Sequence, residues 1–366
     1  MHFVFFGNET VRNAGVRYRA VKFAERLSGE GHRCTLCPPS SVGLWRALYG
    51  NHSRPLKALY LLAVLLNRLA QLRHVLSADA VFIKGPLFPY GPPLLERLIR
   101  LLNPHILFDV DDAMWEPPAF VRSPFLGAVD YGWARKMTRI ARHAVAGNTT
   151  IADYLSGCGG CGVTIVPTCI DMDRHTQKVY GVKAPGATVV LGWTGIRDNL
   201  GYLDNLQEAM RELARTRDIE LLVVSDGEYH PDGVPTRNVK WAPENEIAVL
   251  KEADIGLMPL VDTPRARGKC AFKALQFMGV GTPVLLSPVG MNAEVIEPGV
   301  SGFCASTTEE WRNALERLID DPALRERMGR AARDRVASYY SFDTHLPRFR
   351  AVLEAVAQGK EPQPCA

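Results

Sequence analysis

Three polar side chains interrupt an apolar stretch of the chain at a spacing that suits an anion site. Lys269, Lys273 and Gln276 follow one another at intervals of four and three residues, so on a helix over 269–278 they would share one face. The residues just before this helix are Arg265, Arg267 and Gly268. Free N–H groups at a helix N-terminus bind phosphate well when cations stand beside them. The stretch therefore predicts a phosphate site, the alternative being lysines that extend to solvent.

A second phosphate candidate is the segment Gly192-Trp-Thr-Gly-Ile-Arg197, which follows a predicted strand and opens a helix. Gly195 would let a ligand approach the backbone, and the guanidinium of Arg197 can form two parallel hydrogen bonds to phosphate. Trp193 stands where the strand meets this loop. The segment adds Trp193, Gly195 and Arg197 to the candidate ligand-binding residues.

An acidic cluster, Asp109-Val-Asp-Asp112, ends another predicted strand. Carboxylates at strand ends are well placed for chemistry in α/β folds, and hard metal ions favour them. The alternative is that they cap the following loop in contact with water. One acidic cluster is a weak metal signal, so we predict no metal cofactor here.

The cysteines suggest a zinc site and one glycine-rich motif suggests a dinucleotide site, but the neighbouring sequence favours neither. Two CxxC pairs, Cys34–Cys37 and Cys158–Cys161, resemble halves of a zinc site. However, Cys34 and Cys37 would lie on opposite faces of a strand. The segment 157–162 fits GxGxxG but follows a helix and precedes a strand, the reverse of a dinucleotide site. We therefore predict neither zinc nor a nicotinamide cofactor.

The composition and charge of the chain indicate which kinds of partner, nucleic acid or membrane, it could bind. The 366 residues carry a formal net charge of +4, too small an excess to indicate nucleic acid. The N-terminus shows no leader pattern, and the cysteines are expected to be reduced in the cytoplasm. The apolar segment 56–66 is too short to span a bilayer. Because basic residues flank it, a helix on an anionic membrane surface stays open, but a core helix with solvated ends is favoured.

The elements alternate between strand and helix, which predicts parallel sheets covered by helices. Predicted strands cover 2–6, 34–37, 80–84, 106–110, 144–146, 163–167, 189–193, 219–225, 238–241, 255–260, 283–287 and 302–305. Predicted helices cover 16–30, 92–102, 134–144, 200–216, 244–252, 269–278, 309–320, 323–338 and 346–357. The fold class is thus α/β, with two doubly wound Rossmann-like domains that face each other across a cleft.

The polar, Gly- and Pro-containing segment 176–188 reads as a linker between these domains. We expect an N-terminal domain over 1–175 and a C-terminal domain over 189–345. The closing helix and tail, 346–366, could pack back on the N-terminal domain. In two facing units of this kind, ligands bind at the carboxyl ends of the strands, in the cleft.

These features together resemble glycosyltransferase family 4, the retaining sugar-nucleotide transferases with the two-domain GT-B architecture. The matching segments are 108–115, 163–171, 191–195, 253–260, 273–284, 289–296 and 299–303. The resemblance is most specific over 189–305 and includes Leu191-Gly-Trp-Thr-Gly195 and Lys273-Ala-Leu-Gln276. It implies a nucleotide-sugar donor bound by the C-terminal domain, transfer to a hydroxyl with retention, and no required metal.

The resemblance assigns roles residue by residue. Lys273 would contact the donor diphosphate, together with Arg197 and Lys269. Gln276 stands where the family has an acidic residue that bonds the donor ribose, and Gly268 stands where it has a glutamate. Both departures weaken any role that depends on charge at these two positions. The donor base would contact the segment from Trp241 to Glu246 and the loop after Ser225, which begins at Asp226.

The acceptor side is implied more loosely. Asp111 or Asp112 would orient the acceptor hydroxyl, and the basic loop 7–19 would contribute Asn13, Gly15 and Arg17. A sugar or a lipid-linked acceptor is then expected, as in cell-surface polysaccharide or glycoconjugate synthesis, at the inner face of the membrane or free in the cytoplasm. Two alternatives stay open: a sugar-nucleotide epimerase of the same architecture, and a sugar-nucleotide binding protein without catalysis.

Overall fold

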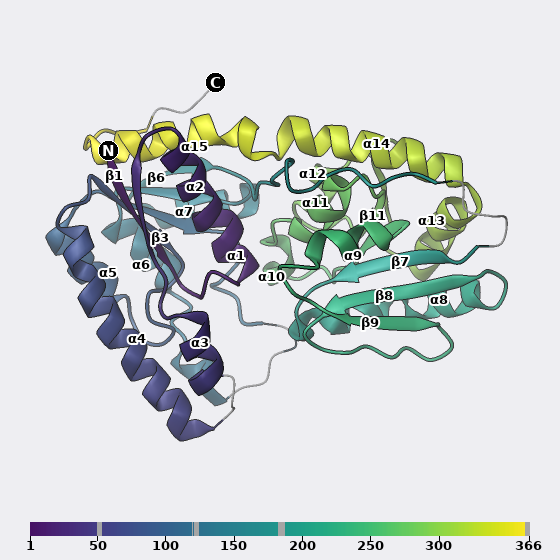
Figure 1. Cartoon of the computed structure of the whole chain (residues 1–366), viewed down its shortest axis with the longest axis horizontal. Coiled ribbons are helices and arrows are strands. Elements are labelled where there is room, and N and C mark those ends of the chain that lie inside the picture. The colour runs from purple at the N-terminus through teal and green to yellow at the C-terminus, as the bar shows by residue number, and fades with distance from the viewer. Residues whose placement is uncertain (50–52, 119, 121–123, 182–186, 363–366) are drawn as a thin grey trace. The chain divides into compact units, whose positions relative to one another are not determined.

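The computed structural model of the chain describes residues 1–49, 53–118, 120, 124–181 and 187–362. It divides into two compact units (Figure 1). Unit 1 contains Met1–Pro117, Arg122–Cys169 and His345–Ala366, and unit 2 contains Pro118–Val121 and Ile170–Thr344. Part of the predicted linker, 182–186, and the last residues of the tail, 363–366, lie outside the described residues.

Unit 1 is built on a parallel sheet in the order β2-β1-β3-β4-β5-β6. Its strands are β1 His2–Gly7, β2 Arg33–Cys37, β3 Ala80–Lys84, β4 Ile106–Val110, β5 His143–Ala146 and β6 Gly162–Ile165. The strands β1, β3, β4 and β5 are buried along their whole length, as expected where helices cover both faces of a parallel sheet.

The helices of unit 1 follow the strands in alternation. They are α1 Ala14–Val16, the π-helical η1 Arg17–Val21, α2 Lys22–Gly29, α3 Val42–Leu44, the π-helical η2 Trp45–Tyr49, α4 Arg54–Val75, α5 Leu94–Leu102, the 3-10 turn η3 Pro124–Ala128, α6 Trp133–Ile140 and α7 Thr149–Cys158. The closing helix α15, Phe342–Ala357, also packs on this unit. Its Phe349 ring stacks on Phe23 at 4.1 Å and meets Phe82 edge-on at 5.5 Å.

Unit 2 is built on a second parallel sheet, in the order β12-β11-β10-β7-β8-β9. Its strands are β7 Val189–Thr194, β8 Ile219–Ser225, β9 Thr236–Lys240, β10 Ile255–Met258, β11 Val284–Leu286 and β12 Gly302–Cys304. Its helices are the 3-10 segment η4 Arg197–Leu206, α8 Gln207–Ala214, α9 Glu246–Glu252, α10 Pro264–Arg267, α11 Phe272–Gly279, α12 Asn292–Val295, α13 Thr308–Asp320 and α14 Pro322–Tyr339.

Glycines let α11 lie close against the sheet of unit 2. A Cβ on Gly256 of β10 would stand 2.6 Å from the ring of Phe277 in α11, and one on Gly192 of β7 would stand 3.0 Å from the same ring. Any side chain at these two positions would push α11 away from the sheet. The two glycines therefore help to set the height of α11 above β7 and β10.

The strand orders place a topological switch point in each unit. In unit 1 the order reverses between β1 and β3, and in unit 2 it reverses between β7 and β10. Ligands of doubly wound folds bind at the carboxyl ends of the strands beside such a reversal. The predicted α/β class with two Rossmann-like units is confirmed, and each unit has one expected place for a ligand.

The division between the units falls between Cys169 and Ile170, several residues before the predicted linker. The reason is that residues after this point contact unit 2. Tyr180 donates a hydrogen bond to the carbonyl of Gly281, and Lys178 forms an ion pair with Asp254. The segment 176–181 is thus attached to unit 2 by Lys178 and Tyr180, while residues 176, 177, 179 and 181 are exposed.

Candidate functional site

The helix predicted over 269–278 begins later than expected. α10 ends at Arg267 with Gly268 as its C-cap, and α11 starts at Phe272. Between them Ala271 has a φ of 49°, the left-handed conformation, and it is the only non-glycine residue with positive φ among the described residues. The prediction that Lys269 shares a helical face with Lys273 is therefore wrong, and Gly268 does not precede the N-terminus of α11.

Lys273 nevertheless reaches the switch point of unit 2 from the first turn of α11. Its Nζ lies 4.4 Å from the centroid of the Trp193 ring, in a cation–π contact. A Cβ on Gly195 would lie 2.5 Å from this Nζ and 2.6 Å from the Trp193 ring. The glycine after β7 thus leaves room for the ammonium group of Lys273 and for the Trp193 ring.

The ammonium group of Lys273 lies in an environment that disfavours its charge. Burial and the nearby charge of Lys269 lower the pKa of Lys273 to about 7. Among the described residues, no carboxylate counteracts this shift. A buried cation without a counter-charge is costly, and a bound anion would remove that cost. Lys269 itself lies with its Nζ 5.9 Å from the centroid of the Tyr202 ring.

Arg197 and Asp226 are joined at the edge of the same strands. The backbone N–H of Arg197 donates to Asp226 Oδ1 at 2.6 Å, and Nη2 of Arg197 donates to the Asp226 carbonyl at 3.1 Å. Both residues are exposed. These bonds tie the start of η4 to the loop after β8, so the guanidinium is held against that loop.

Gln276 is buried and bound to protein. Its exposed fraction is 3%, and its Nε2 donates to Glu246 Oε1 at 3.1 Å. The indole Nε1 of Trp241 donates to the same oxygen at 3.3 Å, and Arg174 lies 3.8 Å from Glu246 Oε2. Glu246, which the sequence did not single out, therefore supplies a carboxylate next to the position where the resembled family carries its acid.

The two arginines of α10 differ in their surroundings. Arg267 is exposed and pairs with Asp262 through two hydrogen bonds of 2.6 and 2.8 Å. Its charge is offset by this carboxylate. Arg265 lies in the same single turn of helix and is partly buried. Within the described residues, Lys273 differs from Arg267 in that no carboxylate offsets its charge.

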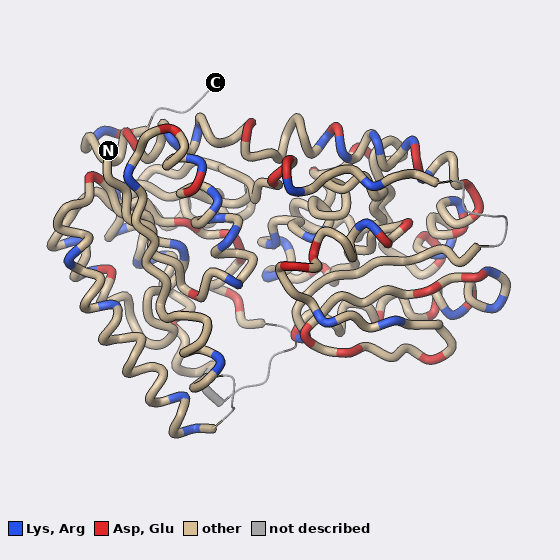
Figure 2. Tube along the Cα trace, viewed as in Figure 1, with Lys and Arg blue, Asp and Glu red and all other residues tan. Residues whose placement is uncertain are grey.

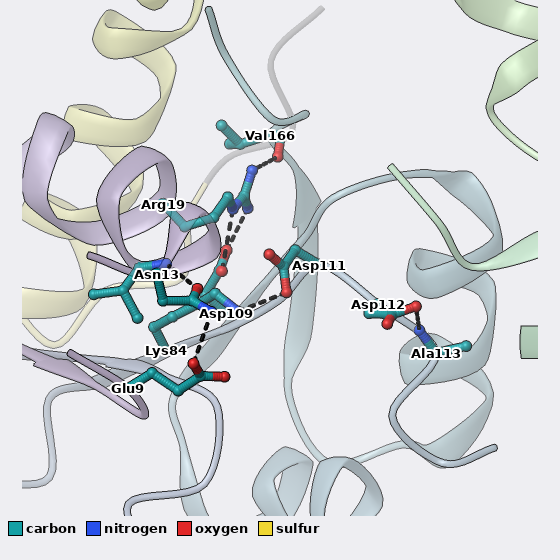
Figure 3. A network of polar contacts seen from close by, with 10 residues as sticks. Glu9, Asn13, Arg19, Lys84, Asp109, Asp111, Asp112, Ala113 and Val166 are labelled. Carbon is teal, nitrogen blue, oxygen red and sulfur yellow. Dashed lines mark hydrogen bonds and ion pairs between the residues drawn. The ribbon is translucent and has the colours of Figure 1, made fainter. Parts of the chain in front are cut away.

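The polar cluster of unit 1 lies at the other switch point, at the ends of β3 and β4 (Figure 3). Lys84, the last residue of β3, forms an ion pair with Asp111 in which Nζ and Oδ1 are 2.5 Å apart. Arg19 pairs with the fully buried Asp109. Nη1 of Arg19 also donates to the carbonyl of Val166 at 2.7 Å. The two cations, Arg19 and Lys84, are therefore each paired with one carboxylate.

The neighbouring charges decide which form of Asp111 exists. Burial opposes ionisation, but Lys84 and Arg19 outweigh it and lower the pKa of Asp111 below its usual range. Burial likewise opposes the charge on Lys84, but Asp111 and Asp109 raise the pKa of that lysine. Asp111 is thus a carboxylate at neutral pH, suited to accept a hydrogen bond and weak as a base.

Two of the predicted acceptor-side residues join this cluster. Asn13 donates to Glu9 Oε2 at 2.7 Å, and its Oδ1 accepts the Val16 N–H at 3.2 Å, which caps α1. A Cβ on Gly15 would lie 3.1 Å from Asn13 Oδ1 and 3.3 Å from Asp111 Oδ2. The start of α1 therefore brings Asn13 and Gly15 against Asp111.

The remaining acceptor-side candidates do not join it in the same way. Asp112 accepts a hydrogen bond of 3.0 Å from the N–H of Ala113 and lies apart from the network in Figure 3. Arg17 is buried, with its guanidinium 5.1 Å from the centroid of the Tyr18 ring. The interpretation of 7–19 as an open basic loop is wrong, because the helix begins at Ala14 and carries Arg17 and Arg19 inward.

No metal site emerges from the described ranges. They contain no group of three or more His, Cys, Asp or Glu side chains that could hold an ion. The seven cysteines within them are free thiols, and Cys365 lies outside them. The segment 157–162 forms the turn from α7 to β6, the context that argued against a dinucleotide site.

Sequence reasoning did not single out Glu9, Arg19, Lys84 and Glu246 one by one, although Glu9 and Arg19 lie in the predicted loop 7–19 and Glu246 ends the predicted segment 241–246. One signal was available for Lys84, since a lysine that ends an otherwise apolar strand beside an acidic strand end is unusual. The other three residues become neighbours of the site only through pairing between distant segments.

Comparison with known proteins finds a family model that covers part of unit 2. Residues 188–321 match a family model described as "Glycosyl transferases group 1". This range contains β7, η4, α11 and thus the surroundings of Lys273. A glycogen synthase from Mycobacterium tuberculosis is 29% identical over 121 residues, which cover 32% of this chain and 28% of that protein. The chain spans between 22% and 37% of the length of the curated relatives that it matches.

Solved structures resemble this chain over nearly its whole length. The sucrose-phosphate synthase of Thermosynechococcus elongatus has a TM-score of 0.71 at 14% identity, covering 98% of this chain and 100% of that one. The Anabaena protein HepE, solved with UDP and glucose, has a TM-score of 0.69 at 14% identity, covering 97% and 100%. At such identities the likeness is one of fold. The family model and these curated relatives are thus glycosyltransferases, and the solved structures show that this chain has the GT-B fold.

Proposed function

We propose that this protein transfers a glycosyl group from a nucleoside-diphosphate sugar to a hydroxyl group. The observation that carries the proposal is Lys273, a cation at the switch point of unit 2 whose charge no described carboxylate offsets. A diphosphate would supply the missing negative charge. The family match over the same residues supports this assignment, as does the nucleotide bound by the structurally similar HepE.

The chemistry follows from where charge develops. When the bond between the sugar and the diphosphate breaks, negative charge grows on the leaving oxygen, so fixed cations lower the barrier. In the proposal Lys273 contacts the diphosphate, and Arg197 and Lys269 add charge around it. We propose no metal cofactor. Retention at the anomeric carbon is part of the proposal and rests on the sequence resemblance.

Unit 1 would serve the acceptor. Asp111 is ionised and held by Lys84, so we assign it the role of accepting a hydrogen bond from the attacking hydroxyl. Its lowered pKa makes it a better orienting group than a proton acceptor. Asn13 and Gly15 would shape the space beside it. We propose synthesis of a cell-surface polysaccharide or glycoconjugate, in the cytoplasm, as the setting.

The experiment that tests the donor site is calorimetric titration of the metal-free protein with UDP, GDP and their common sugar conjugates. We expect one nucleotide to bind in the micromolar range and Lys273→Ala to abolish this binding. Lys240→Ala, a change of an exposed lysine on β9 of the same unit, is the matched control and should bind normally. Equal binding by wild type and Lys273→Ala would overturn the assignment.

Product analysis separates this proposal from an epimerase of the same architecture. The bound nucleotide sugar is incubated with and without a pool of sugar and lipid-linked acceptors, and the products are separated by chromatography. Transfer or slow hydrolysis supports the transferase. Conversion to an isomeric nucleotide sugar without any acceptor contradicts it, and so does binding with neither transfer nor hydrolysis, the result expected of a non-catalytic binding protein.

A further inference from the structure

The helix α4 of unit 1 exposes an apolar face that its own unit does not cover. It has 22 residues, with a mean hydropathy of 1.2 in its most apolar window and only 17% of that window buried. Leu59, Leu62, Leu66 and Leu69 are between 45% and 58% exposed. Their spacing of three or four residues places them along one side of the helix. The expectation of a core helix is therefore wrong.

The opposite face of α4 is bound to unit 1 by polar contacts. Arg68 is 1% exposed and donates hydrogen bonds to the carbonyls of Leu87, Cys37 and Gly7. Asn67 donates to two more carbonyls, in the segment before α3. Although α4 is long and apolar enough to cross a membrane, crossing would break these buried bonds, which is costly. The geometry favours a helix that stays on the unit and exposes one side.

A second short segment extends the apolar side of α4. The turn η2 packs beside α4, and α3 packs on η2; these two turns expose Leu44 and Trp45 by 37% and 39%. Tryptophan is enriched where a protein meets the boundary between lipid and water, because its ring is apolar and its N–H is polar. We call these two residues and the four exposed leucines of α4 the apolar face.

The charges around the apolar face have one sign. Residues 31–78 contain six Lys or Arg and no Asp or Glu, although the whole chain has 39 acidic residues. The helix α4 itself holds four of these six basic residues and no acidic residue, and blue positions follow its trace in Figure 2. Arg46, Arg54 and Arg73 are exposed at the borders of the apolar face. Such a surface complements a negatively charged partner with an apolar interior.

From this combination we infer that the apolar face of unit 1 binds the surface of an anionic lipid bilayer, with the leucines and Trp45 inserted among the lipids and the arginines at the headgroups. A second copy of the chain fits less well. A symmetric contact would bring the same basic residues of both copies together, and like charges repel. The inference is independent of the proposed glycosyl transfer.

Vesicle sedimentation tests this inference on the full chain. The protein is mixed with vesicles of phosphatidylcholine alone, or of phosphatidylcholine with phosphatidylglycerol, at low and high salt. We expect binding to the anionic vesicles that weakens at high salt. Leu62→Gln with Leu66→Gln should reduce binding by at least about tenfold, because two apolar side chains no longer insert. Arg54→Gln with Arg73→Gln should reduce it by about fivefold per charge.

Matched controls remove equal apolar area or charge from unit 2, with Val179→Gln and Val300→Gln in one variant and Arg215→Gln and Arg327→Gln in the other. All four positions are exposed, and these variants should bind vesicles like the wild type. Thermal unfolding and UDP binding of the α4 variants establish that they are folded, and loss of UDP binding alone would concern the proposed function only.

Three results would overturn the inference. The first is absence of binding to either kind of vesicle. The second is binding that the α4 variants and their controls reduce equally. The third is a dimer, detected by light scattering without lipid, that the α4 leucine variant dissociates, since the face would then join two copies.

Discussion

The two units use the same architecture and differ in how they treat charge at the switch point. In unit 1, the cluster at the ends of β3 and β4 contains two matched pairs, Arg19 with Asp109 and Lys84 with Asp111. In unit 2, the position between β7 and β10 has Lys273, whose pKa burial and Lys269 lower to about 7. A matched cluster is ready to orient a neutral group, whereas an unmatched cation requires an anion.

The largest effect that would test this difference between the units is expected when Lys273, the cation without a counter-charge, is removed. We expect Lys273→Met to lower turnover by about 100- to 1,000-fold, the usual effect of deleting one group that stabilises developing charge. The melting temperature should rise, because a buried cation without a partner is replaced by an apolar side chain of similar length. Steady-state kinetics and calorimetric unfolding measure the two effects. A lower melting temperature would mean that the charge of Lys273 is compensated in the free protein.

Removing a matched charge in unit 1 should have the opposite effect on stability. We expect Asp111→Asn to lower turnover by about 100-fold and to lower the melting temperature, since Lys84 loses its counter-charge. Donor affinity should not change. The double variant Lys84→Met with Asp111→Leu should recover stability without recovering turnover. If Asp111→Asn weakened UDP binding as much as turnover, Asp111 would not serve the acceptor.

The pH dependence of donor binding sharpens the same contrast. Lys273 binds a diphosphate in its charged form, so UDP affinity should fall by up to about tenfold per pH unit as pH rises above 7. Protein stability should instead increase between pH 7 and the ordinary lysine pKa. In that window the unfolded chain holds a proton that the folded lysine has released. The prediction is tested by measuring UDP affinity and unfolding free energy at several pH values across this range. The variant Lys273→Met is the control and should show neither the fall in affinity nor the rise in stability.

The smallest expected effect concerns the glutamine beside that lysine. Gln276→Glu would place a second carboxylate against Glu246, where Gln276 now donates a hydrogen bond of 3.1 Å. We expect a loss of stability of about 1 kcal/mol, which is eased at low pH where the pair holds a proton. UDP affinity should change by less than about fivefold. A large gain in affinity would show that a charged group at 276 contacts the donor.

Much of the fold could be predicted because the strands and helices are indicated by local patterns of apolar and polar residues. The strands over 80–84, 106–110 and 219–225 match the structure residue for residue, since each is a short buried run between breaks. The helix start at 269 could not be predicted in this way. The left-handed Ala271 interrupts it, although nothing in the side chain of alanine favours that conformation. Only the packing of α10 and α11 on the sheet holds it there.

By itself, the sequence determined the two alternating α/β halves and the segments that carry Lys273, Gly195 and Asp111, because hydrophobic periodicity and strand ends are local properties. The tertiary structure decided which charges meet. Arg19 and Asp109 are 90 residues apart, and Gln276 and Glu246 are 30 residues apart. The same holds for the solvent exposure of α4, which depends on what the rest of unit 1 covers. Pairing and burial are relations between distant segments, so they exist only once the chain has folded.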